Sequence, residues 1–462
     1  MSRITSSPPQ RGRLFHGLTV TSALAALALL PAAFPATASV EAPVTEAAAE
    51  SSLPSGNTDY RTLADYETDM DQLVSDHPDL VEPLTLPFPT SSGRTVRGIE
   101  ITDNVGAKDG KPVFVTVGMH HGNEWPSGEM TMEYAIDLVN RAAAGDPEVT
   151  ALLDQARVVV VPIVNVDGFV NNRRQTDTNV DMNRNYGFGW LPISTSGAEP
   201  WSEPESRNIE WLLTTRQATT FVTQHTCIQV VLYPPLQLKA GPTQDVDRLH
   251  DLASRMATHY GPGYIARDSA HDYETTGEAI DWAYFATRGL AITAETCPDR
   301  GVERTFETQV VDTYPEHRLA MNEGLINTAS PEQHATITGK APKDAVLRIE
   351  RSFEMYTQPF TQEDGTERPE AFTTTHTSEM ELPHPNGKFS WAVNPSYLPT
   401  PPYQAEGIVP DRTGFDDEQW ILTCERPDGT VLQTVPVSVD LGESVEVNLQ
   451  ECKKNFHKKS IG

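Results

Sequence analysis

The residues best suited to hold a metal ion lie in the segment 118–125, which reads GMHHGNEW. His121 and Glu124 are three positions apart, so one turn of backbone can direct both side chains at a single cation. Imidazole nitrogen and carboxylate oxygen are both good zinc ligands. The neighbouring His120 competes as a ligand, but its spacing to Glu124 is one residue too long. An H-x-x-E pair alone is a weak signal, because a surface loop with a polar cap produces it equally well.

Two further side chains that could bind a metal or take part in a reaction follow apolar runs elsewhere in the chain. A catalytic zinc ion takes three protein ligands and keeps one position open. His225, which follows the run 220–223, is the candidate for the third ligand. Glu295 follows the run 290–294, and a carboxylate beside a metal-activated water molecule can act as a general base. Taken singly, either residue is explained as well by a structural role.

Strands and helices alternate between residues 60 and 330, which predicts how these side chains are positioned. Apolar runs predict buried strands at 113–117, 158–164, 220–223 and 290–294. Stretches with helical spacing lie before and between them. This alternation predicts an α/β domain with a mixed, largely parallel sheet flanked by helices. Because sites in open α/β sheets form beyond the carboxyl ends of the strands, His121, His225 and Glu295 are expected to converge.

The composition narrows the classes of function. The chain has 462 residues, with 64 Asp and Glu against 35 Lys and Arg, and a formal net charge of −29. This acidic balance argues against a nucleic-acid partner, which needs clustered cations, and against docking on an anionic membrane. Hydrophobic residues make up 38% of the chain, which is enough for packed cores, and 4 cysteines are too few for a disulfide-built scaffold.

The organisation of the chain predicts an exported protein of two domains. A positive start, an apolar run and the small residues Ala36-Thr37-Ala38 predict a signal peptide over residues 1–38. The further expected segments are a flexible linker over 39–57, a catalytic domain over 58–330, a small all-β sandwich over 331–452 and a basic tail over 453–462. The protein is therefore expected to be secreted, and to be a monomer.

The order of several sequence blocks resembles the zinc carboxypeptidases of the carboxypeptidase A/B type, over about residues 60–330. His121, Glu124 and the distant His225 look like the zinc ligands of that family, which implies one Zn²⁺ per chain. The segment 165–169, NVDGF, is similar to the family's Asn-Pro-Asp-Gly turn, and 181–185, DMNRN, matches its Asp-x-Asn-Arg-Asn block. Each block is modest evidence, but all of them in order at compatible spacing are very improbable by chance.

The resemblance also implies the residues that perform the reaction. Glu295 lies where the family places its general base, thirteen residues after Trp282. Arg174, nine residues before Asn183, would stabilise the negative charge that develops on the carbonyl oxygen. Its neighbour Arg173 is the alternative for that role.

A third set of residues would bind the substrate. By resemblance, Asn183, Arg184 and Tyr273 would hold the free terminal carboxylate of a peptide or protein, which an arginine can bind through two hydrogen bonds. This would make the protein an exopeptidase, because an internal peptide bond offers no carboxylate. Ile280 occupies the position at the base of the family's specificity pocket, which implies apolar or aromatic C-terminal residues.

The four cysteines are expected to form two disulfides. Cys227 follows His225 by two residues and Cys297 follows Glu295 by two, so equal offsets past neighbouring strands bring the two thiols together. Cys424 and Cys452 are expected to pair within the β domain.

Two alternatives to a secreted metallocarboxypeptidase stay open. On the same fold, the chain can be a cell-wall peptidase or an amidohydrolase acting on another acyl-amino acid. In a different class, it can be an inactive binding protein that keeps the fold. Such proteins usually lack a metal ligand or the general base, and neither is missing here.

Overall fold

The computed structural model describes residues 51–238, 243–381, 387–400, 403–404, 407–408 and 414–456. The signal peptide expected over 1–38, most of the expected linker and the end of the basic tail lie outside these residues. Every helix in the described part of the chain is too short or too polar to cross a bilayer.

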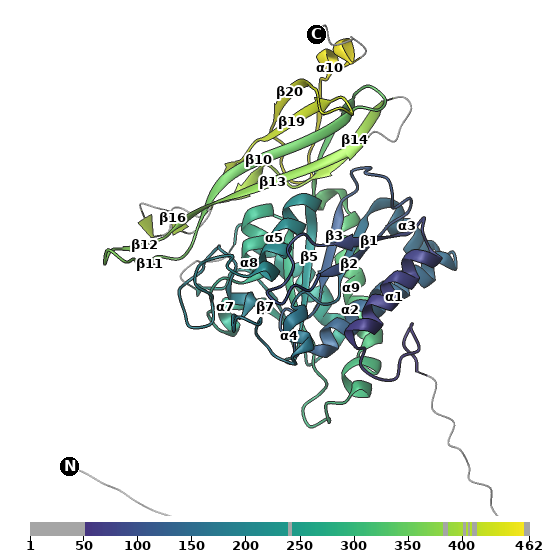
Figure 1. The fold of residues 1–462 in the computed structure, drawn as a ribbon, viewed down its shortest axis with the longest axis vertical. Helices are drawn as coiled ribbons and strands as arrows, with labels where there is room; N and C mark the ends of the chain where they lie inside the picture. The colour runs from purple at the N-terminus through teal and green to yellow at the C-terminus, as the bar shows by residue number, and fades with distance from the viewer. Residues whose placement is uncertain are drawn as a thin grey trace, which may run out of the picture. The chain divides into compact units, whose positions relative to one another are not determined.

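A mixed sheet of eight strands forms the centre of the larger part of the fold (Figure 1). The strands lie in the order β1-β2-β4-β3-β5-β8-β6-β7. Their bounds are β1 Val81–Thr85, β2 Arg97–Ile101, β3 Val113–Val117, β4 Arg157–Val161, β5 Ala218–His225, β6 Val230–Tyr233, β7 Ile265–Asp268 and β8 Leu290–Glu295. The strands β4, β3, β5 and β8 form a parallel centre, and β2 and β6 flank it in antiparallel orientation. The predicted α/β class with a largely parallel sheet is confirmed.

The four strands predicted from apolar runs are the four that form this parallel centre. Every residue of β3, β4 and β5 is buried, because helices cover both faces of the sheet and leave no solvent side. The two outermost strands lack this signal: β1 is only partly buried, and β7 has no buried residue. Periodicity therefore located the strands that carry the candidate ligands and missed those at the edges.

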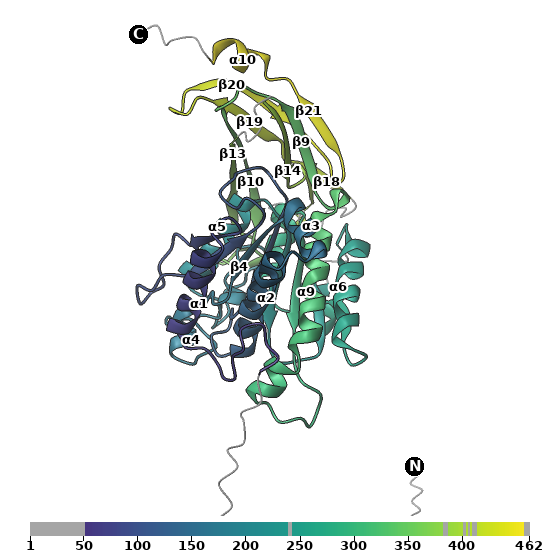
Figure 2. The ribbon, with the colours of Figure 1, turned by 90° about the vertical axis from the view of Figure 1, so that its right-hand side faces the viewer.

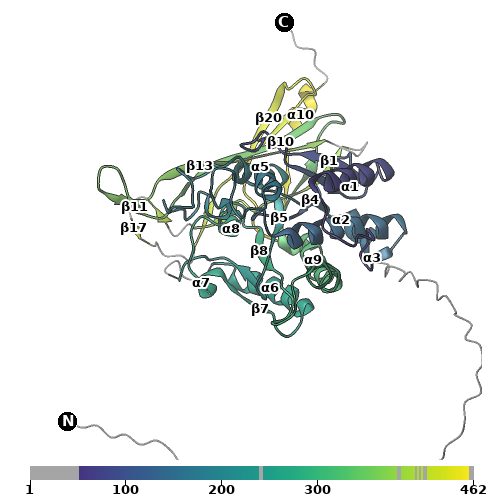
Figure 3. The same cartoon turned by 60° about the horizontal axis from the view of Figure 1, so that its bottom comes forward.

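Helices cover the two faces of the sheet. The helices α1, α2, α3, α6 and α9 lie on one face (Figure 2), and α5 and α8 lie on the other (Figure 3). Their bounds are α1 Leu63–Asp76, α2 Trp125–Ala143, α3 Pro147–Gln155, α5 Pro204–Arg216, α6 Val246–Tyr260, α8 Ala279–Thr287 and α9 Tyr314–Ala329. Shorter helical segments are α4 Val166–Val170, η1 Met182–Arg184, α7 Ser269–Asp272, η3 Glu307–Val311 and η4 Pro331–Gln333.

Beyond residue 334 the regular structure of the described residues consists of strands and one short helix, α10 (Gln450–Asn455). One sheet has the order β13-β10-β19-β20 and a second has the order β14-β9-β21. The bounds are β9 Ala335–Lys340, β10 Val346–Tyr356, β11 Phe360–Thr361, β12 Glu367–Arg368, β13 Ala371–Glu381, β14 Lys388–Val393, β15 Tyr397–Pro399, β16 Tyr403–Gln404, β17 Gly407–Ile408, β18 Phe415–Asp417, β19 Trp420–Glu425, β20 Val431–Val437 and β21 Ser444–Val447. Trp391 from one sheet and Trp420 from the other are buried in one core, as in a sandwich.

A disulfide joins the last helix, α10 (Gln450–Asn455), to this sandwich. Cys424 in β19 bonds to Cys452 in α10, so the predicted pair is confirmed. Lys453 belongs to the same helix, which means that the expected basic tail begins as ordered structure.

The sandwich shares its packing with the eight-stranded sheet. Phe353 and Met355 of β10 and the buried Leu398 belong to the core cluster of the larger sheet and its helices. The side-chain amide nitrogen, Nδ2, of Asn394 also donates to the carbonyl of Ala218, at the start of β5, over 2.9 Å. The described residues accordingly form one compact unit.

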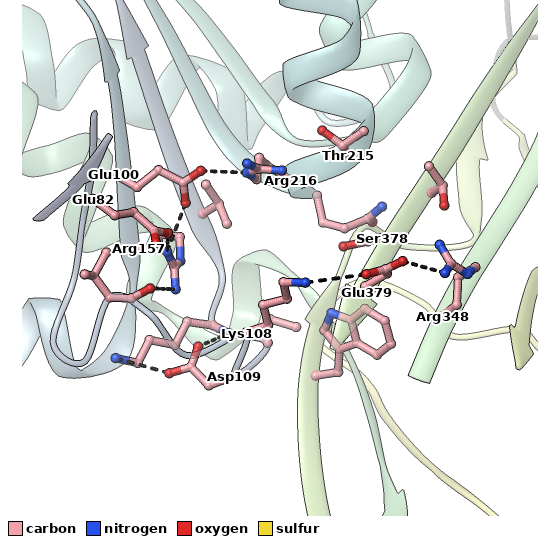
Figure 4. Close-up of a pocket in the computed structure, with 18 of the residues that line it drawn as sticks. Glu82, Glu100, Lys108, Asp109, Arg157, Thr215, Arg216, Arg348, Ser378 and Glu379 are labelled. Carbon is pink, nitrogen blue, oxygen red and sulfur yellow. Dashed lines mark hydrogen bonds and ion pairs between the residues drawn. The ribbon is translucent and has the colours of Figure 1, made fainter. Parts of the chain in front are cut away.

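A pocket of about 340 Å³ lies between β10–β13 and the nearby ends of the larger sheet (Figure 4). Its charged side chains are engaged with one another. Arg157 pairs with Glu100 at 2.9 Å and with Glu82 at 3.0 Å, and Lys108 reaches Glu379 of β13 at 3.5 Å. These ion pairs make the pocket a polar junction between the sheet that contains β10 and β13 and the eight-stranded sheet.

The chain is already anchored within the segment expected to be a flexible linker. Leu53 is buried in one hydrophobic cluster with Phe306, and the hydroxyl of Ser55 donates to the carboxylate of Glu133 over 2.6 Å. The linker prediction over 39–57 is therefore wrong for its last part. A composition rich in Ala, Glu, Ser and Pro hid one buried leucine and one partly buried hydrogen bond.

Glu205 is a fully buried acid near the start of α5, and it predicts how stability depends on pH. Burial, and then the like charges of Glu203 and Asp167, raise its pKa from 4.5 to about 7. The folded state thus holds this proton more tightly than the unfolded state does. The stability that follows is fully present below pH 4.5 and is lost as the pH rises through 7.

We expect Glu205→Gln to stabilise the protein by roughly 3 kcal/mol at pH 8 and to change little at pH 4.5, since the penalty of burying the charge is removed. Urea unfolding at the two pH values measures this difference. The exposed Glu199→Gln is the matched control for loss of one negative charge. An equal effect at both pH values would show that ionisation of Glu205 is not the cause.

Candidate active site

Three neighbouring parallel strands, β3, β5 and β8, end at the same edge of the larger sheet. His225 is the last residue of β5, Glu295 is the last residue of β8, and the two are register partners. His121 follows the end of β3 by four positions. As expected from the strand ends, these three side chains line one cavity, whose volume is about 240 Å³.

A close backbone contact holds the loop that carries His121. A Cβ atom at Gly122 would lie 2.1 Å from the carbonyl carbon of Gly168, so no larger residue fits without moving the backbone. The side chain of Asn165 accepts from the amide of Gly168 at 2.9 Å and donates to the carbonyl of His120 at 3.3 Å. The Asn-x-Asp-Gly turn thereby fixes the position of His121.

His121, Glu124 and His225 form a group that fits a metal ion. Each offers one ligand atom, and these atoms all lie within 4.8 Å of one another. Nδ1 of His121 lies 2.7 Å from Oε1 of Glu124, and Nδ1 of His225 lies 3.2 Å from Oε2. All three residues are buried. Two imidazole nitrogens and one carboxylate oxygen are a donor set of catalytic zinc, so the residues present suit that ion.

Asp181 orients the first of these imidazoles from behind. Its Oδ1 lies 3.1 Å from Nε2 of His121, the ring nitrogen that faces away from Glu124. A carboxylate in this position holds the proton on Nε2 and leaves Nδ1 available to a cation. Asp181 begins the block 181–185, but no role was predicted for it from the sequence. The sequence feature that could have indicated this role is the carboxylate at the start of that block.

The charges of this group shift the pKa values of its side chains. Burial acts to lower the pKa of His121, but Glu124 and Asp181 outweigh it and raise that pKa to about 9. Burial acts to raise the pKa of Glu124, but His121 and His225 hold it well below its usual range. The carboxylates therefore stabilise positive charge at His121, whereas at His225 burial outweighs Glu124 and lowers the pKa.

Glu295 lines the same cavity as this group. Its Oε2 is buried and has no hydrogen-bond partner among the described residues. Burial, and then the charge of Glu124, raise the pKa of Glu295 to about 8. A carboxylate whose pKa lies near neutrality can both take up and release a proton, which is what a general base needs.

Of the two neighbouring arginines, Arg174 is the one that lines the cavity. Its Nη1 lies 3.5 Å from Oε1 of Glu124, and its Nη2 donates to Oδ2 of Asp181 over 2.9 Å. Arg173 instead donates to the side chain of Asn179. The structure thus favours Arg174 for the stabilisation of charge in the cavity.

Asn183, Arg184 and Tyr273 lie together on a further wall of the same cavity. Nη2 of Arg184 donates to the hydroxyl of Tyr273 over 2.9 Å. Oδ1 of Asn183 accepts from the backbone amide of Ala279, at the start of α8, over 3.0 Å. This bond ties the wall to α8 and leaves the amide nitrogen of Asn183 for a ligand. A cation, an amide and a hydroxyl are suitable groups for binding a carboxylate.

Ile280 is the one predicted site residue that does not line the cavity. It is buried within α8, at 1% exposure. Leu232, Thr293 and Glu278 line the cavity instead. No role was predicted for Glu278 from the sequence, although it lies two residues before Ile280.

The other predicted disulfide lies at the edge of the cavity, which Cys227 lines. Cys227 bonds to Cys297, with Cα atoms 4.7 Å apart, so this pairing is also confirmed. Each cysteine lies two residues beyond a candidate functional residue, His225 or Glu295. The bond therefore links the segments that leave β5 and β8.

The chain is similar to known proteins over the part that contains this site. A family model described as zinc carboxypeptidase matches residues 66–316, which is more than half of the chain. A zinc carboxypeptidase of Simulium vittatum is 27% identical over 260 residues, which are 49% of this chain and 81% of that protein. Carboxypeptidase A2 of Mus musculus is 26% identical over 286 residues, which are 55% of this chain and 63% of that protein. The chain thus spans less than two thirds of the second relative.

The fold has a counterpart among solved structures. The crystal structure of carboxypeptidase A from Helicoverpa armigera superimposes with a TM-score of 0.51 and 21% sequence identity. The superposition covers 58% of this chain and 74% of that chain. At this identity the likeness concerns the fold of the larger sheet and its helices.

We expect Asp181→Asn to weaken zinc binding by roughly 10–100-fold, because the amide no longer holds the imidazole of His121 in the orientation and tautomer that the ion needs. Competition with a chromophoric chelator measures the affinity. Asp177→Asn, four residues earlier and outside the cavity, is the control. Unchanged affinity in Asp181→Asn would remove this residue from the account of the metal site.

Proposed function

Because the chain belongs to the zinc carboxypeptidase family, we propose that it is a zinc metallocarboxypeptidase that hydrolyses the C-terminal peptide bond of peptides or proteins. One observation carries the proposal. A single cavity joins the metal-binding group, His121, Glu124 and His225, to the cations Arg174 and Arg184. The metal-binding end suits the reacting bond, and the cationic wall suits the free carboxylate beside it.

The proposal assigns a step of the reaction to each group around the metal site. When bound, zinc supplies Lewis-acid chemistry that activates a water molecule and polarises the scissile carbonyl. Glu295 takes the proton from the attacking water and delivers it to the leaving amine. Arg174 faces the negative charge that grows on the carbonyl oxygen.

The substrate is held by its free end. Arg184 forms a charge-assisted pair with the terminal carboxylate, and the amide of Asn183 and the hydroxyl of Tyr273 complete its hydrogen bonds. The 2.9 Å contact between Arg184 and Tyr273 supports this role, since it shows that both groups reach one point in the cavity. A substrate without a free carboxylate leaves the buried cation of Arg184 without that partner.

The finer proposals concern the substrate side chain and the place of action. Leu232 and Ile228 line the cavity and support binding of apolar or aromatic C-terminal side chains. The signal peptide predicted over residues 1–38 supports secretion. The protein is proposed to act outside the cell as a monomer on the C-termini of peptides.

A peptide with a free C-terminal acid is expected to be cleaved roughly 10–100-fold more efficiently, by kcat/KM, than its C-terminal amide, because only the acid pairs with Arg184. Arg184→Gln should reduce this ratio toward one, and Arg173→Gln, outside the cavity, should leave it unchanged. Initial rates followed by chromatography give the ratio. Equal rates for acid and amide in the unaltered protein would favour an amidohydrolase on the same fold.

We expect Glu295→Gln to lower kcat by roughly 10²–10⁴-fold while zinc remains bound, because the amide cannot carry the proton and the three ligands are intact. Metal analysis beside steady-state rates separates the two effects. The exposed Glu303→Gln serves as the control. Near-normal rates in Glu295→Gln would contradict its role as general base.

A further inference from the structure

His120 is a buried imidazole next to the metal-binding group, and the proposed reaction does not use it. Its Nδ1 lies 2.7 Å from Oγ1 of Thr223, and its Nε2 lies 2.8 Å from the hydroxyl oxygen of Tyr186. Hydroxyl groups therefore occupy both ring nitrogens. The metal-binding group contains His121 rather than His120, although the sequence alone left the two in competition.

Thr223 connects His120 with the third candidate ligand. Its Oγ1 also lies 3.2 Å from Nε2 of His225. The other ring nitrogen of His225, Nδ1, lies 3.2 Å from Oε2 of Glu124, within the metal-binding group. The rings of His120 and His225 are stacked, with centroids 5.5 Å apart and an angle of 24° between their planes. The ring of His225 is thus held at Nε2 by a hydroxyl and along its face by a second imidazole.

The direction of donation along this chain of hydrogen bonds follows from the need of a cation. A cation at Nδ1 of His225 requires the ring proton on Nε2, which then donates to Oγ1 of Thr223. The hydroxyl of Thr223 can donate its own proton to Nδ1 of His120. Because both partners of His120 are uncharged hydroxyls, its buried ring is neutral and carries its one proton on Nε2, facing Tyr186.

The opposite direction of donation would remove the ligand atom. A proton on Nδ1 of His120 would donate to Thr223, and the hydroxyl of Thr223 would then donate to Nε2 of His225. The proton of His225 would lie on Nδ1, which is the position that the cation needs. Since Thr223 has a single hydroxyl proton, an acceptor at Nδ1 of His120 is what keeps Nδ1 of His225 free.

Tyr186 attaches the far end of this chain to the segment that carries the carboxylate-binding residues. It follows Arg184 by two residues, and its backbone amide donates to the carbonyl of Gly277 over 3.1 Å. The ring of Tyr186 is buried and stacks on Trp282, with centroids 6.3 Å apart. A fixed phenol gives His120 a fixed partner, so rotation of the His120 ring is opposed at both nitrogens.

We propose that His120 is a positioning residue for the metal site, which acts through the hydroxyl of Thr223 to hold the tautomer and orientation of His225. The inference rests on the metal site of the proposed function and not on its reaction. It gives the second imidazole a support comparable to that of Asp181 for His121. The two supports differ, because Asp181 brings a negative charge whereas the chain through Thr223 consists of neutral groups.

The test measures the zinc affinity of the full chain by competition with a chromophoric chelator. Thr223→Val, which keeps the shape without the hydroxyl, should weaken binding roughly 10–100-fold, and Thr223→Ser should stay within about threefold of the unaltered protein. His120→Leu should weaken binding roughly tenfold, because the acceptor for the Thr223 hydroxyl is lost. Thr220→Val is the matched control, since Thr220 is a buried threonine of the same strand whose hydroxyl accepts from Asn327.

A double variant tests whether His120 acts through Thr223. If it does, Thr223→Val combined with His120→Leu loses no more affinity than Thr223→Val alone, because the second change removes a partner of a hydroxyl that is already absent. Losses that multiply would show that the two residues act independently and would overturn the proposed path. Unchanged affinity in His120→Leu would overturn it as well.

Cobalt(II) in place of zinc separates positioning of the ligand from a loss of fold. The visible absorption of bound cobalt reports the geometry of its ligands, so it should change in Thr223→Val and His120→Leu but not in Thr220→Val. A lower Tm of metal-free His120→Leu with an unchanged cobalt spectrum and zinc affinity would make His120 a packing residue only. Absence of peptide hydrolysis would count against the proposed reaction alone, because affinity and spectrum are read without turnover.

Discussion

The balance of charge in one buried cavity is the constraint on which the site depends. The carboxylates of Glu124 and Glu295 face the same small space, and the charge of one raises the pKa of the other. Burial makes such repulsion strong, so cations must be present in the wall or arrive from outside. Arg174 and Arg184 supply part of this charge, and a bound metal ion would supply more.

Several connections in the fold hold these charged side chains close together. The parallel pairing of β5 and β8 brings His225 and Glu295 to the same level, and the disulfide two residues later links the segments that follow. On the other side, the contact of Gly122 with Gly168 holds the metal-binding loop. Since these connections come from different parts of the chain, the group cannot relax by moving any one segment alone.

The sandwich is linked to the loop between Tyr273 and Glu278 through a shared hydrogen-bond acceptor. The carbonyl of Gly189 accepts from the side chain of Gln358 at 2.7 Å and from the hydroxyl of Thr276 at 2.8 Å. Gln358 follows β10, and Thr276 belongs to the loop between Tyr273 and Glu278. The second part of the fold thus contacts the backbone beside the residues proposed to bind the terminal carboxylate.

Local patterns were sufficient to locate the central strands, because burial between two helical layers produces apolar runs. They also located the candidate ligand pair, because metal binding by His121 and Glu124 needs only their short spacing. The outer strands and the buried Leu53 lack such a pattern, so they became visible only in the folded chain. The same holds for Glu278 and Ile280, two residues apart at the start of one helix. Which of the two faces the cavity depends on how α8 packs against β5 and β8, and contacts between segments so distant along the chain leave no trace in local spacing.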